Sequence, residues 1–495
     1  MNEIINPQEN QDELGPFSPR KQAIHDLSQA QAAERQSWVK KNSSYHNEDH
    51  RYLGFLVHEG QRILDLGCGL GDLLASLKPS LGVGVDFSEN MVDEARKLHP
   101  INDFPHLNFV HGDIENPDVL SGIEGPFDVI VLSDTIGSLD DCQALLESLH
   151  SLCTRDTRII VSYYATFWDP VLAVGELAGF KMPQVAQNAL STTDIGNLLQ
   201  LAGFSVTKRE WRQLVPFKLM GLGTLINRYI ATLPFIRRLC LRNYMVACSD
   251  RHAGYDALSA TVLIPCRNEK GNIEAAVKRL PRFCDDLEIL YVEGHSRDGT
   301  YEEIERVIAA YPQYDIKATR QDGKGKGDAV RKGFDMARGD VLMILDADLT
   351  MPPEDIPKFY QALKSGQGEF INGSRLVYPM ESEAMRFLNL IANRMFSYIF
   401  TYLLNQRYTD TLCGTKVLTK AHYQRIADNR DYFGEFDPFG DFDLIFGASK
   451  LNLKVAEIPI RYRNRDYGET QISRFRHGLL LIRMVVFAFF KLKAI

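Results

Sequence analysis

Two aspartates separated by one residue could hold a divalent metal ion. Asp346 and Asp348 follow the apolar run 341–345, which is typical of a buried strand. Residues two apart on an extended chain share a face, so both carboxylates can meet one hard cation such as Mg²⁺ or Mn²⁺. Such a cation would neutralise charge on a departing diphosphate. The same motif also occurs in surface turns, but the strand before it and the proline turn after it favour a metal site.

Other chemically useful residues surround this motif. The stretch RQDGKGKGDA (residues 320–329) precedes a predicted helix, and its Lys324 and Lys326 could lie beside a diphosphate. A flexible solvated loop is the alternative interpretation. The acidic stretch 433–448 offers Asp443 and Asp441 as bases for an acceptor, although capping of a helix would equally explain either residue. An acceptor that is already anionic would need no base.

A glycine-rich turn in the first half could bind a nucleoside. The segment RILDLGCGLGDLL is predicted to be a strand over 62–66, a turn with three glycines and the start of a helix. The next predicted strand ends at Asp86, placed to accept both ribose hydroxyls. Further strands end near Asp113, which could reach an adenine amino group, and Asp134. Taken singly, Asp65 could cap the helix and Asp113 could belong to an Asx-turn; their joint placement favours a binding site.

The motifs DLGCGLG, GVDFS, HGD and FDVIVLSD occur in this order and resemble those of class I S-adenosylmethionine-dependent methyltransferases. The resemblance covers about residues 45–212 and implies a Rossmann-like fold. The third glycine comes one residue too early for the GxGxxG turn of dinucleotide enzymes. The implied S-adenosylmethionine site comprises Asp65, Gly67, Gly69 and Gly71 near the methionine part, Asp86 on the ribose, Asp113 near the adenine, and Phe87 and Ile114. Asp134, Tyr163 and Tyr164 are candidate acceptor-side residues, with surface loops as the alternative.

The second half resembles glycosyltransferase family 2, the inverting type with a GT-A fold. The motifs IPCRNE, VEGHSRDGT, GKGDA, DADLTMPPE, NGSR and PIRYRNRDYGETQ follow one another between about residues 256 and 475. This order is most similar to that of dolichol- or polyprenyl-phosphate mannose synthases. The resemblance implies a nucleotide-sugar donor, linked to GDP or UDP, and a lipid-phosphate or glycan acceptor.

The resemblance also implies a donor site, and two positions depart from the family pattern. Glu293 and Gly294 stand where the family has paired aspartates, which leaves the choice between GDP and UDP open, and Gln471 replaces a lysine of the phosphate site. The implied nucleotide-sugar site comprises Pro265, Arg267, Glu269, Val292, Glu293, Lys324, Asp346, Ala347, Arg375, Arg465 and Gln471.

The composition of the chain limits the kinds of partner and the cellular setting that we expect. The net charge of -8 argues against nucleic acid, which rewards clustered Lys and Arg. The stretch 461–495 carries eight basic and two acidic residues, a balance of +6 that fits phosphate or anionic lipid. The eight cysteines form no CxxC pair and the N-terminal residues are polar, so we expect a cytoplasmic setting.

Membrane contact, where it occurs, is expected to be peripheral. No run of eighteen apolar residues lacks a charge, so a spanning helix is not predicted. The apolar stretches 384–404 and 477–495 contain basic residues and could lie on the inner face of a membrane. Packing against the catalytic domain is the equal alternative.

The chain is therefore predicted to be an α/β protein with a Rossmann-like methyltransferase domain followed by a GT-A domain. The predicted parts are an N-terminal extension (1–44), the methyltransferase domain (45–212), a helical appendage and linker (213–255), the glycosyltransferase domain (256–475) and a C-terminal amphipathic helix (476–495). The predicted function is bifunctional transfer of methyl and sugar groups. One alternative is a glycosyltransferase whose front half only binds S-adenosylmethionine as a regulatory domain. The other is an assembly module with two degenerate sites, against which the intact aspartates and glycines speak.

Overall fold

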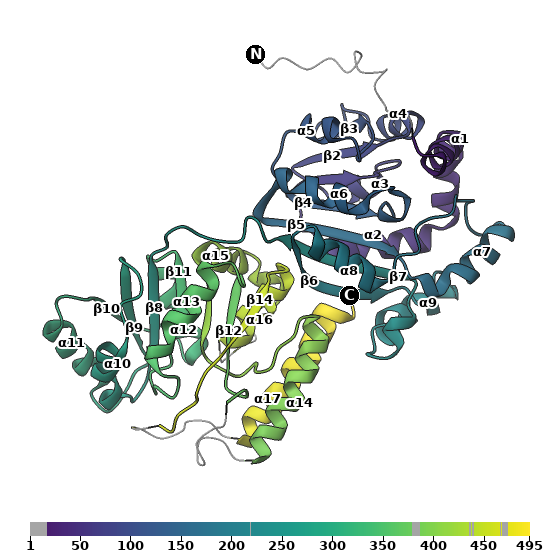
Figure 1. The fold of residues 1–495 in the computed structure, drawn as a ribbon. Helices are drawn as coiled ribbons and strands as arrows, with labels where there is room; N and C mark the ends of the chain where they lie inside the picture. The colour runs from purple at the N-terminus through teal and green to yellow at the C-terminus, as the bar shows by residue number, and fades with distance from the viewer. Residues whose placement is uncertain are drawn as a thin grey trace. The chain divides into compact units, whose positions relative to one another are not determined.

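The computed structural model describes residues 17–217, 219–378, 387–434, 437, 440–465, 467 and 474–495. The chain folds into two compact units, Met1–His252 and Ala253–Ile495. Each unit is built on one seven-stranded sheet with helices packed against it (Figure 1).

The sheet of the first unit has the strand order β3-β2-β1-β4-β5-β7-β6. Strands β1 to β5 pair in parallel, whereas β7 pairs antiparallel with both β5 and β6. The inner strands are apolar along most of their length because helices cover them. The strands are β1 (Arg62–Leu66), β2 (Leu81–Asp86), β3 (Leu107–His111), β4 (Phe127–Ser133), β5 (Cys153–Tyr164), β6 (Phe204–Arg212) and β7 (Arg242–Ser249).

Some helices of the first unit begin at side-chain caps. Ser88 accepts a hydrogen bond from the amide of Met91 at the start of α4, and Ser191 and Asp194 form a capping box on α8. The helices are α1 (Pro19–Lys41), α2 (Ser43–Leu56), α3 (Asp72–Ser76), α4 (Glu89–Leu98), α5 (Pro117–Ser121), α6 (Cys142–Ser148), α7 (Asp169–Leu177), α8 (Thr192–Leu201) and α9 (Leu222–Leu225), with shorter turns η3 (Thr166–Trp168), η5 (Ile226–Ile230) and η6 (Ile236–Leu239).

The sheet of the second unit has the order β10-β9-β8-β11-β13-β12-β14. Only β13 runs antiparallel to its neighbours, β11 and β12, among the strands that the structure describes. The strands are β8 (Ala260–Cys266), β9 (Leu287–Glu293), β10 (Asp315–Arg320), β11 (Val341–Ile344), β12 (Phe370–Ser374), β13 (Lys416–Thr419) and β14 (Val455–Pro459). The main helices are α10 (Ile273–Arg279), α11 (Thr300–Ala310), α12 (Lys326–Met336), α13 (Ile356–Lys364), α14 (Phe387–Leu404), α15 (Lys420–Asp428), α16 (Asp441–Lys450) and α17 (Arg474–Ala488).

Two expected boundaries differ from the structure. The helical appendage predicted for 213–255 is wrong at its end, because Arg242–Ser249 form β7, a fully buried strand inside the first sheet. Its apolar run resembles the helical stretch before it, and only the pairing with β5 and β6 makes it a strand. The predicted boundary at residue 44 also differs, because α1 of the expected N-terminal extension packs against α4 and belongs to the first unit.

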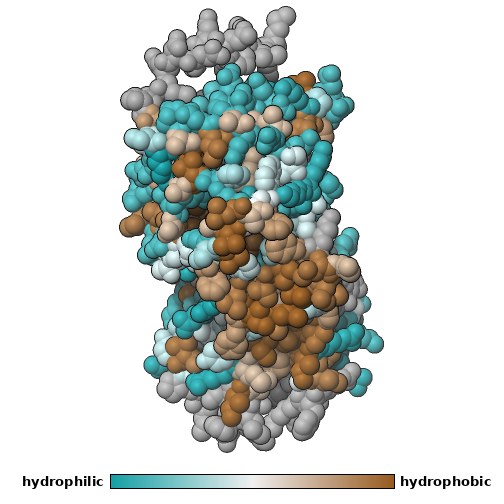
Figure 2. All heavy atoms as spheres, turned by 90° about the vertical axis from the view of Figure 1, so that its right-hand side faces the viewer, coloured by the Kyte–Doolittle hydropathy of each residue, from teal (hydrophilic) through white to brown (hydrophobic). Residues whose placement is uncertain are grey.

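The two apolar stretches expected near a membrane form α14 and the C-terminal part of the chain, α17 with its last turn. Both helices leave large apolar side chains exposed, including Met395, Tyr398, Leu479, Ile482 and Phe490. Hydrophobic side chains form brown areas on the surface drawn in Figure 2. In the part of the chain that the structure describes, no helix is both long and apolar enough to cross a membrane.

Candidate active sites

The glycine turn of the first unit links β1 to α3 and needs glycine at two positions. Gly67 and Gly71 adopt φ angles of 81° and 74°. A Cβ atom on Gly67 would lie 2.4 Å from Oγ1 of Thr135, and one on Gly71 would lie 2.4 Å from the ring of Phe109. Gly69 has no neighbour within 4 Å of that position, so the turn leaves open space there for a ligand.

The carboxylate of Asp86, at the end of β2, ties this turn to the next strand. It accepts hydrogen bonds from the amides of Gly69 and Ser88, each at 2.9 Å. Burial raises the pKa of Asp86, and the two amide donors partly oppose that effect. The carboxylate therefore lies at the carboxyl end of the strand beside the turn, where ligands of open α/β sheets bind.

Asp65 is the most perturbed carboxylate of this site. Its side chain lies within β1 and the residue is 2% exposed. Burial, together with the negative charge of Asp86, raises the pKa of Asp65 to about 7. Asp65 thus changes charge near neutral pH, and a positively charged ligand would favour its ionised form.

Lys21 of α1 enters the same site. Its Nζ lies 2.6 Å from Asp113 Oδ2 and 2.7 Å from Glu115 Oε2. Burial by itself lowers the pKa of Lys21, but the two carboxylates outweigh that effect and raise it. The carboxylate expected near adenine is therefore held by a lysine 92 residues earlier in the chain, which sequence reasoning missed.

The remaining expected cofactor residues line a small cavity. Phe87 packs against His25 of α1, with ring centroids 5.5 Å apart, and Ile114 is buried. The cavity has a volume of about 30 Å³, which is enough to admit water. It is lined by Lys21, Gly67, Val85, Asp86, Phe87, Asp113, Ile114, Glu115, Thr135, Ser138 and Leu139. Lys21 of α1 therefore shares one cavity with the carboxylates of Asp86 and Asp113.

Asp134, directly after β4, pairs with a buried arginine that the sequence did not suggest. Arg242 at the start of β7 is fully buried and donates to Asp134, and its Nε lies 3.1 Å from Asp49 Oδ1. Burial raises the pKa of Asp134, and Arg242 opposes this. Asp134 also has a φ of 60°, a strained conformation that is concentrated at functional sites.

A larger cavity opens beside Asp134. Its volume is about 270 Å³, and Tyr163 and Tyr164 contribute to its wall. The expected acceptor-side residues therefore surround one cavity. The other wall residues are Ile136, Gly137, Thr166, Asp169, Leu172, Ala173, Glu176, Lys181, Gln184, Val185, Ala186, Gln187, Asn188, Ala189 and Leu190.

In the second unit, each of the two predicted metal ligands pairs with a cation. Lys326 Nζ, at the start of α12, lies 2.7 Å from Asp346 Oδ1, and Arg465 Nη2 lies 2.7 Å from Asp348 Oδ2. Arg465 also reaches Glu269 Oε1 at 2.9 Å. Residues from the segments after β8, β11 and β14 and from the start of α12 therefore meet at one place. Lys326, rather than the exposed Lys324, makes this contact.

Arg375, after β12, is held rigidly by a residue that the sequence analysis did not single out. Its Nε and Nη2 lie 2.6 and 2.9 Å from the two carboxylate oxygens of Asp410. Burial alone would raise the pKa of Asp346, but the charges of Lys326, Lys416 and Arg375 outweigh it and lower that pKa. The site thus keeps Asp346 ionised and surrounds it with cations suited to phosphate.

A glycine closes this site from another side. A Cβ atom on Gly414 would lie 2.0 Å from Asp346 Oδ2 and 2.5 Å from Lys326 Nζ. A side chain at residue 414 would therefore displace Asp346 or Lys326. No local pattern pointed to Gly414, because it lies in a loop without a motif.

The two candidate bases, Asp441 and Asp443, have different partners in the structure. Asp441 begins α16, and its Oδ1 lies 3.6 Å from Lys326 Nζ. This oxygen is buried and accepts no hydrogen bond from the residues that the structure describes. Asp443 instead pairs with Arg430 Nε at 3.2 Å. Asp441 therefore joins the site of Asp346, whereas Asp443 points to another partner.

The other expected donor-site residues differ in their surroundings. Pro265 is half-buried at the end of β8, Arg267 is exposed, Ala347 is buried, and Gln471 lies outside the described residues. Val292 is fully buried, with Cγ2 3.0 Å from where a Cβ of Gly333 would lie, so its side chain packs in the core against α12.

Glu293 is buried too and accepts a hydrogen bond from the amide of Ser296. Its Oε2 lies 3.7 Å from Arg320. The carboxylate that replaces the family's aspartate is thus held within the turn after β9.

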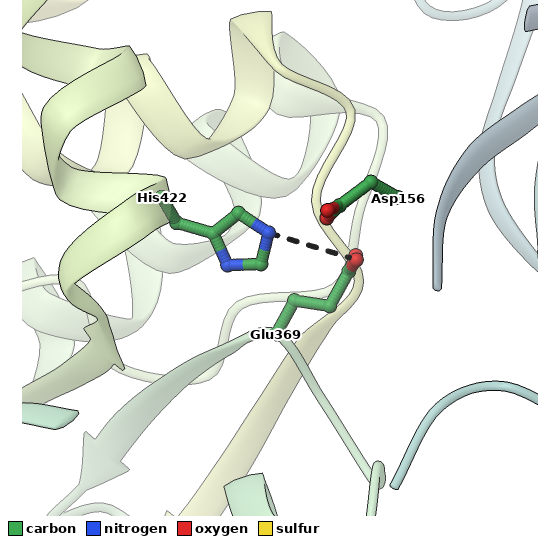
Figure 3. Close-up of side chains that lie close together, drawn as sticks. All are labelled: Asp156, Glu369 and His422. Atoms are coloured by element: carbon green, nitrogen blue, oxygen red, sulfur yellow. Dashed lines mark ion pairs between the residues drawn. The ribbon is translucent and has the colours of Figure 1, made fainter. Parts of the chain in front are cut away.

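A histidine and a glutamate lie close together at the opposite end of β12. His422 Nε2 is 4.0 Å from Glu369 Oε1 (Figure 3). Glu369 precedes β12, whereas Arg375 follows it. Glu369 also accepts a hydrogen bond from the amide of Lys454 at 2.7 Å, which ties β12 to the segment before β14.

Comparison with known families agrees with this division of the chain. Residues 261–429 match the family model described as Glycosyl transferase family 2. Residues 28–209 match the model described as Methyltransferase domain. The second match begins within α1, in agreement with the docking of α1 on the first unit.

Two curated relatives resemble the second half. Over 222 residues the chain is 39% identical to a dolichol-phosphate mannosyltransferase of Pyrococcus furiosus, covering 44% of this chain and 60% of the relative. Over 113 residues it is 34% identical to a dolichol-phosphate mannosyltransferase of Saccharomyces cerevisiae, covering 22% of this chain and 42% of the relative. The chain thus spans between two fifths and three fifths of the length of these proteins.

Solved structures resemble each half at low identity. A methyltransferase of Thermotoga maritima, described as a possible histamine N-methyltransferase, has a TM-score of 0.35 and 18% identity, covering 46% of this chain and 99% of its own. Glucosyl-3-phosphoglycerate synthase of Mycobacterium tuberculosis has a TM-score of 0.35 and 14% identity, covering 48% of this chain and 80% of its own.

Proposed function

Because the chain carries a methyltransferase domain followed by a domain of glycosyl transferase family 2, we propose that it is a bifunctional transferase. The second unit transfers a sugar from a nucleotide diphosphate to a polyprenyl-phosphate or glycan acceptor. The first unit transfers a methyl group from S-adenosylmethionine. One observation carries the proposal for sugar transfer: Asp346, Asp348 and Asp441 converge with Lys326 and Arg465 at the ends of separate strands and helices.

The residues of the second site suit a diphosphate leaving group. Asp346 and Asp348 offer hard oxygen ligands for Mg²⁺ or Mn²⁺. The buried Oδ1 of Asp441, which accepts no hydrogen bond from the described residues, lies 3.6 Å from Lys326 Nζ. When bound, the cation supplies Lewis-acid stabilisation of the diphosphate. Lys326, Arg375 and Arg465 would bind phosphate oxygens and hold the donor in place.

The acceptor proposal rests on the relatives and on charge. Both curated relatives are called dolichol-phosphate mannosyltransferases, and the cations of this site suit an acceptor phosphate. Such a phosphate is already a nucleophile. Asp441 is then needed as a base only for a hydroxyl acceptor.

Binding of GDP- and UDP-linked sugars with Mg²⁺ or Mn²⁺ tests this function, followed by transfer to polyprenyl phosphate in detergent. We expect Asp348→Ala to abolish metal-dependent donor binding. The matched control is Asp322→Ala, because Asp322 is exposed and pairs only with Lys332 among the ion pairs described. Full metal-dependent binding by Asp348→Ala would show that the metal site is misassigned.

For the first unit, Asp86 and the glycine turn would hold S-adenosylmethionine, which supplies an activated methyl group. Asp134 would accept the proton that an acceptor hydroxyl or amine loses when its oxygen or nitrogen takes the methyl group. The cavity of about 270 Å³ beside Asp134 has room for such an acceptor. Arg242 fixes the carboxylate of Asp134 in place.

A second function, binding of S-adenosylmethionine for regulation alone, is favoured by one observation: Lys21 lines the candidate nucleoside site and pairs with Asp113, the carboxylate expected near adenine. Radiolabelled S-adenosylmethionine with lipid and glycan fractions distinguishes the two functions. Methyl transfer that is lost in Asp134→Asn, with ligand binding retained, supports catalysis. Ligand binding that changes the rate of sugar transfer without any labelled product supports regulation. Asp86→Ala should weaken ligand binding in either case.

A further inference from the structure

Helix α7 of the first unit is apolar, yet the unit does not bury it. None of its nine residues is buried. Exposed apolar side chains recur along it and its flanks at helical spacing: Phe167 (69% exposed), Val171, Val174, Leu177 (91%) and Phe180. Monomeric proteins rarely expose so continuous an apolar stripe without a partner.

A second apolar segment adjoins this stripe. Residues 219–241, which include α9, η5 and η6, expose Leu222, Leu225, Ile230 and Phe235, the last by 91%. Trp168 Nε1 donates to the carbonyl of Leu239 at 2.9 Å, and the amide of Ala165 donates to the carbonyl of Leu241 at 2.8 Å. The start of α7 and the end of η6 are therefore bonded together, and the two segments form one surface, which we term the α7–α9 face.

The α7–α9 face carries charges of both signs, which lie in different segments. Residues 219–241 contain three basic residues and no acidic one, whereas α7 carries Asp169 and Glu176, in a chain whose net charge is -8. The basic residues are Arg228, Arg237 and Arg238, and Arg237 Nη1 lies 4.0 Å from Glu210 Oε1. Basic residues interspersed with exposed Leu, Ile and Phe are typical of segments that lie at the surface of an anionic bilayer.

The α7–α9 face also adjoins the acceptor cavity. Leu172, Ala173 and Glu176 of α7 belong to the wall of the cavity that contains Asp134, while Val171, Val174 and Leu177 of the same helix are exposed. One helix thus separates the cavity from the apolar surface, so a molecule that is anchored in a bilayer could present its polar head to Asp134.

From these observations we propose that the α7–α9 face lies on an anionic phospholipid bilayer and that the methyl acceptor is the head group of a membrane lipid. The second statement rests on the proposed methyl transfer, whereas the first does not. A second copy of the chain, or another part of the same chain, would be a competing occupant of the face. The arginines that are interspersed with exposed apolar side chains in residues 219–241 favour anionic lipid over either.

An environment-sensitive fluorophore on a cysteine introduced by Leu177→Cys tests the bilayer contact in the full chain. Seven of the eight native cysteines are buried, and Cys284→Ser removes the partly exposed one. Ile101→Cys is the matched control, because Ile101 is 72% exposed in a turn before β3. The probes are vesicles of phosphatidylcholine with and without phosphatidylglycerol.

We expect the emission at position 177 to shift to the blue with anionic vesicles, much less with neutral ones, and not at position 101. The label position matters because α14 and α17 could bind vesicles independently. Unchanged emission at position 177 would overturn the proposal. So would a blue-shifted emission without vesicles, which would mean that protein already covers the face; a change of oligomeric state in Leu177→Glu would identify a second copy as its occupant.

Measuring methyl transfer tests the proposed lipid acceptor separately from the proposed bilayer contact. Val174→Glu with Leu177→Glu should lower methyl transfer to vesicle lipids at least tenfold while S-adenosylmethionine binding stays unchanged. Equal transfer by this variant would refute a lipid acceptor presented from this face. Absence of S-adenosylmethionine binding by the unaltered chain would instead refute the proposed function and leave the vesicle result standing.

Discussion

Replacing Asp65 by Asn should stabilise the first unit in a manner that depends on pH. An ordinary aspartate has a pKa of 3.8, whereas burial and Asp86 raise that of Asp65 to about 7. At roughly 1.4 kcal/mol per pH unit, this difference corresponds to about 4 kcal/mol of cost when the folded chain holds the ionised form.

The direction in which the stability changes with pH follows from proton binding by Asp65 in the folded and unfolded states. Between pH 4 and pH 7, roughly, the unfolded chain has released the proton of Asp65 and the folded chain keeps it, so stability falls as pH rises through this range. Above about pH 7 the full cost is present in the folded state. The variant Asp65→Asn should therefore match the unaltered chain near pH 4 and exceed its stability by up to about 4 kcal/mol at pH 8.

Urea unfolding followed by tryptophan fluorescence measures this effect selectively. The three tryptophans, Trp38, Trp168 and Trp211, all lie in the first unit, so the signal does not report on the second. Asp103→Asn, which removes an exposed carboxylate of the same unit, should change little at either pH. A stability difference for Asp65→Asn that is the same at pH 5 and pH 8 would refute the reasoning.

The same titration predicts how ligand binding depends on pH. A positively charged ligand stabilises ionised Asp65, so S-adenosylmethionine should bind more tightly as pH rises through about 7. Binding at pH 6 should release close to one proton, measured by calorimetry in buffers of different ionisation enthalpy. The variant Asp65→Asn should release no such proton at pH 6. The pH dependence of its binding should then reflect only the amino group of the ligand, which titrates near pH 8.

Three further changes test separate contacts. Lys21→Met should raise the affinity for S-adenosylmethionine about tenfold in calorimetry, because the ligand no longer displaces an ion pair worth roughly 1–2 kcal/mol; weaker binding would mean that Lys21 contacts the ligand. Gly67→Ala should cost the first unit roughly 2–3 kcal/mol in urea unfolding, since its φ is positive and its Cβ would meet Thr135. Arg465→Gln should weaken metal-dependent donor binding at least tenfold because it leaves Asp348 misplaced; unchanged affinity would assign Arg465 a purely structural role.

Much of the site could be predicted because, in a parallel sheet, residues that follow successive strands in the sequence lie close together in space. Asp65, Asp86, Asp346 and Asp348 lie within or directly after buried strands, as their apolar neighbours indicated. Such residues meet at one edge of the sheet wherever the strands are parallel. Six ordered motifs then identified the second family, which a local pattern alone would not do.

The missed residues share a different property: their partners are far away in sequence. Lys21 reaches Asp113 across 92 residues, and Arg242 reaches Asp49 across 193. No local period encodes such a pair, since a lysine in a polar helix is ordinarily a solvated residue. The strand β7 was not predicted for the same reason, because its apolar run forms a strand only by pairing with β5 and β6.

The position of β7 in the sheet determines how far the chain must extend before the first unit can fold completely. The last strand of the first unit, β7, is inserted between β5 and β6, so a nascent chain holds an open edge on β5 until residue 249 has been synthesised. A fragment truncated at residue 212 would keep that edge for good, and unpaired edges recruit other chains into aggregates. The shortest soluble version of the methyltransferase unit should therefore extend past Ser249, about forty residues beyond the end of the family match.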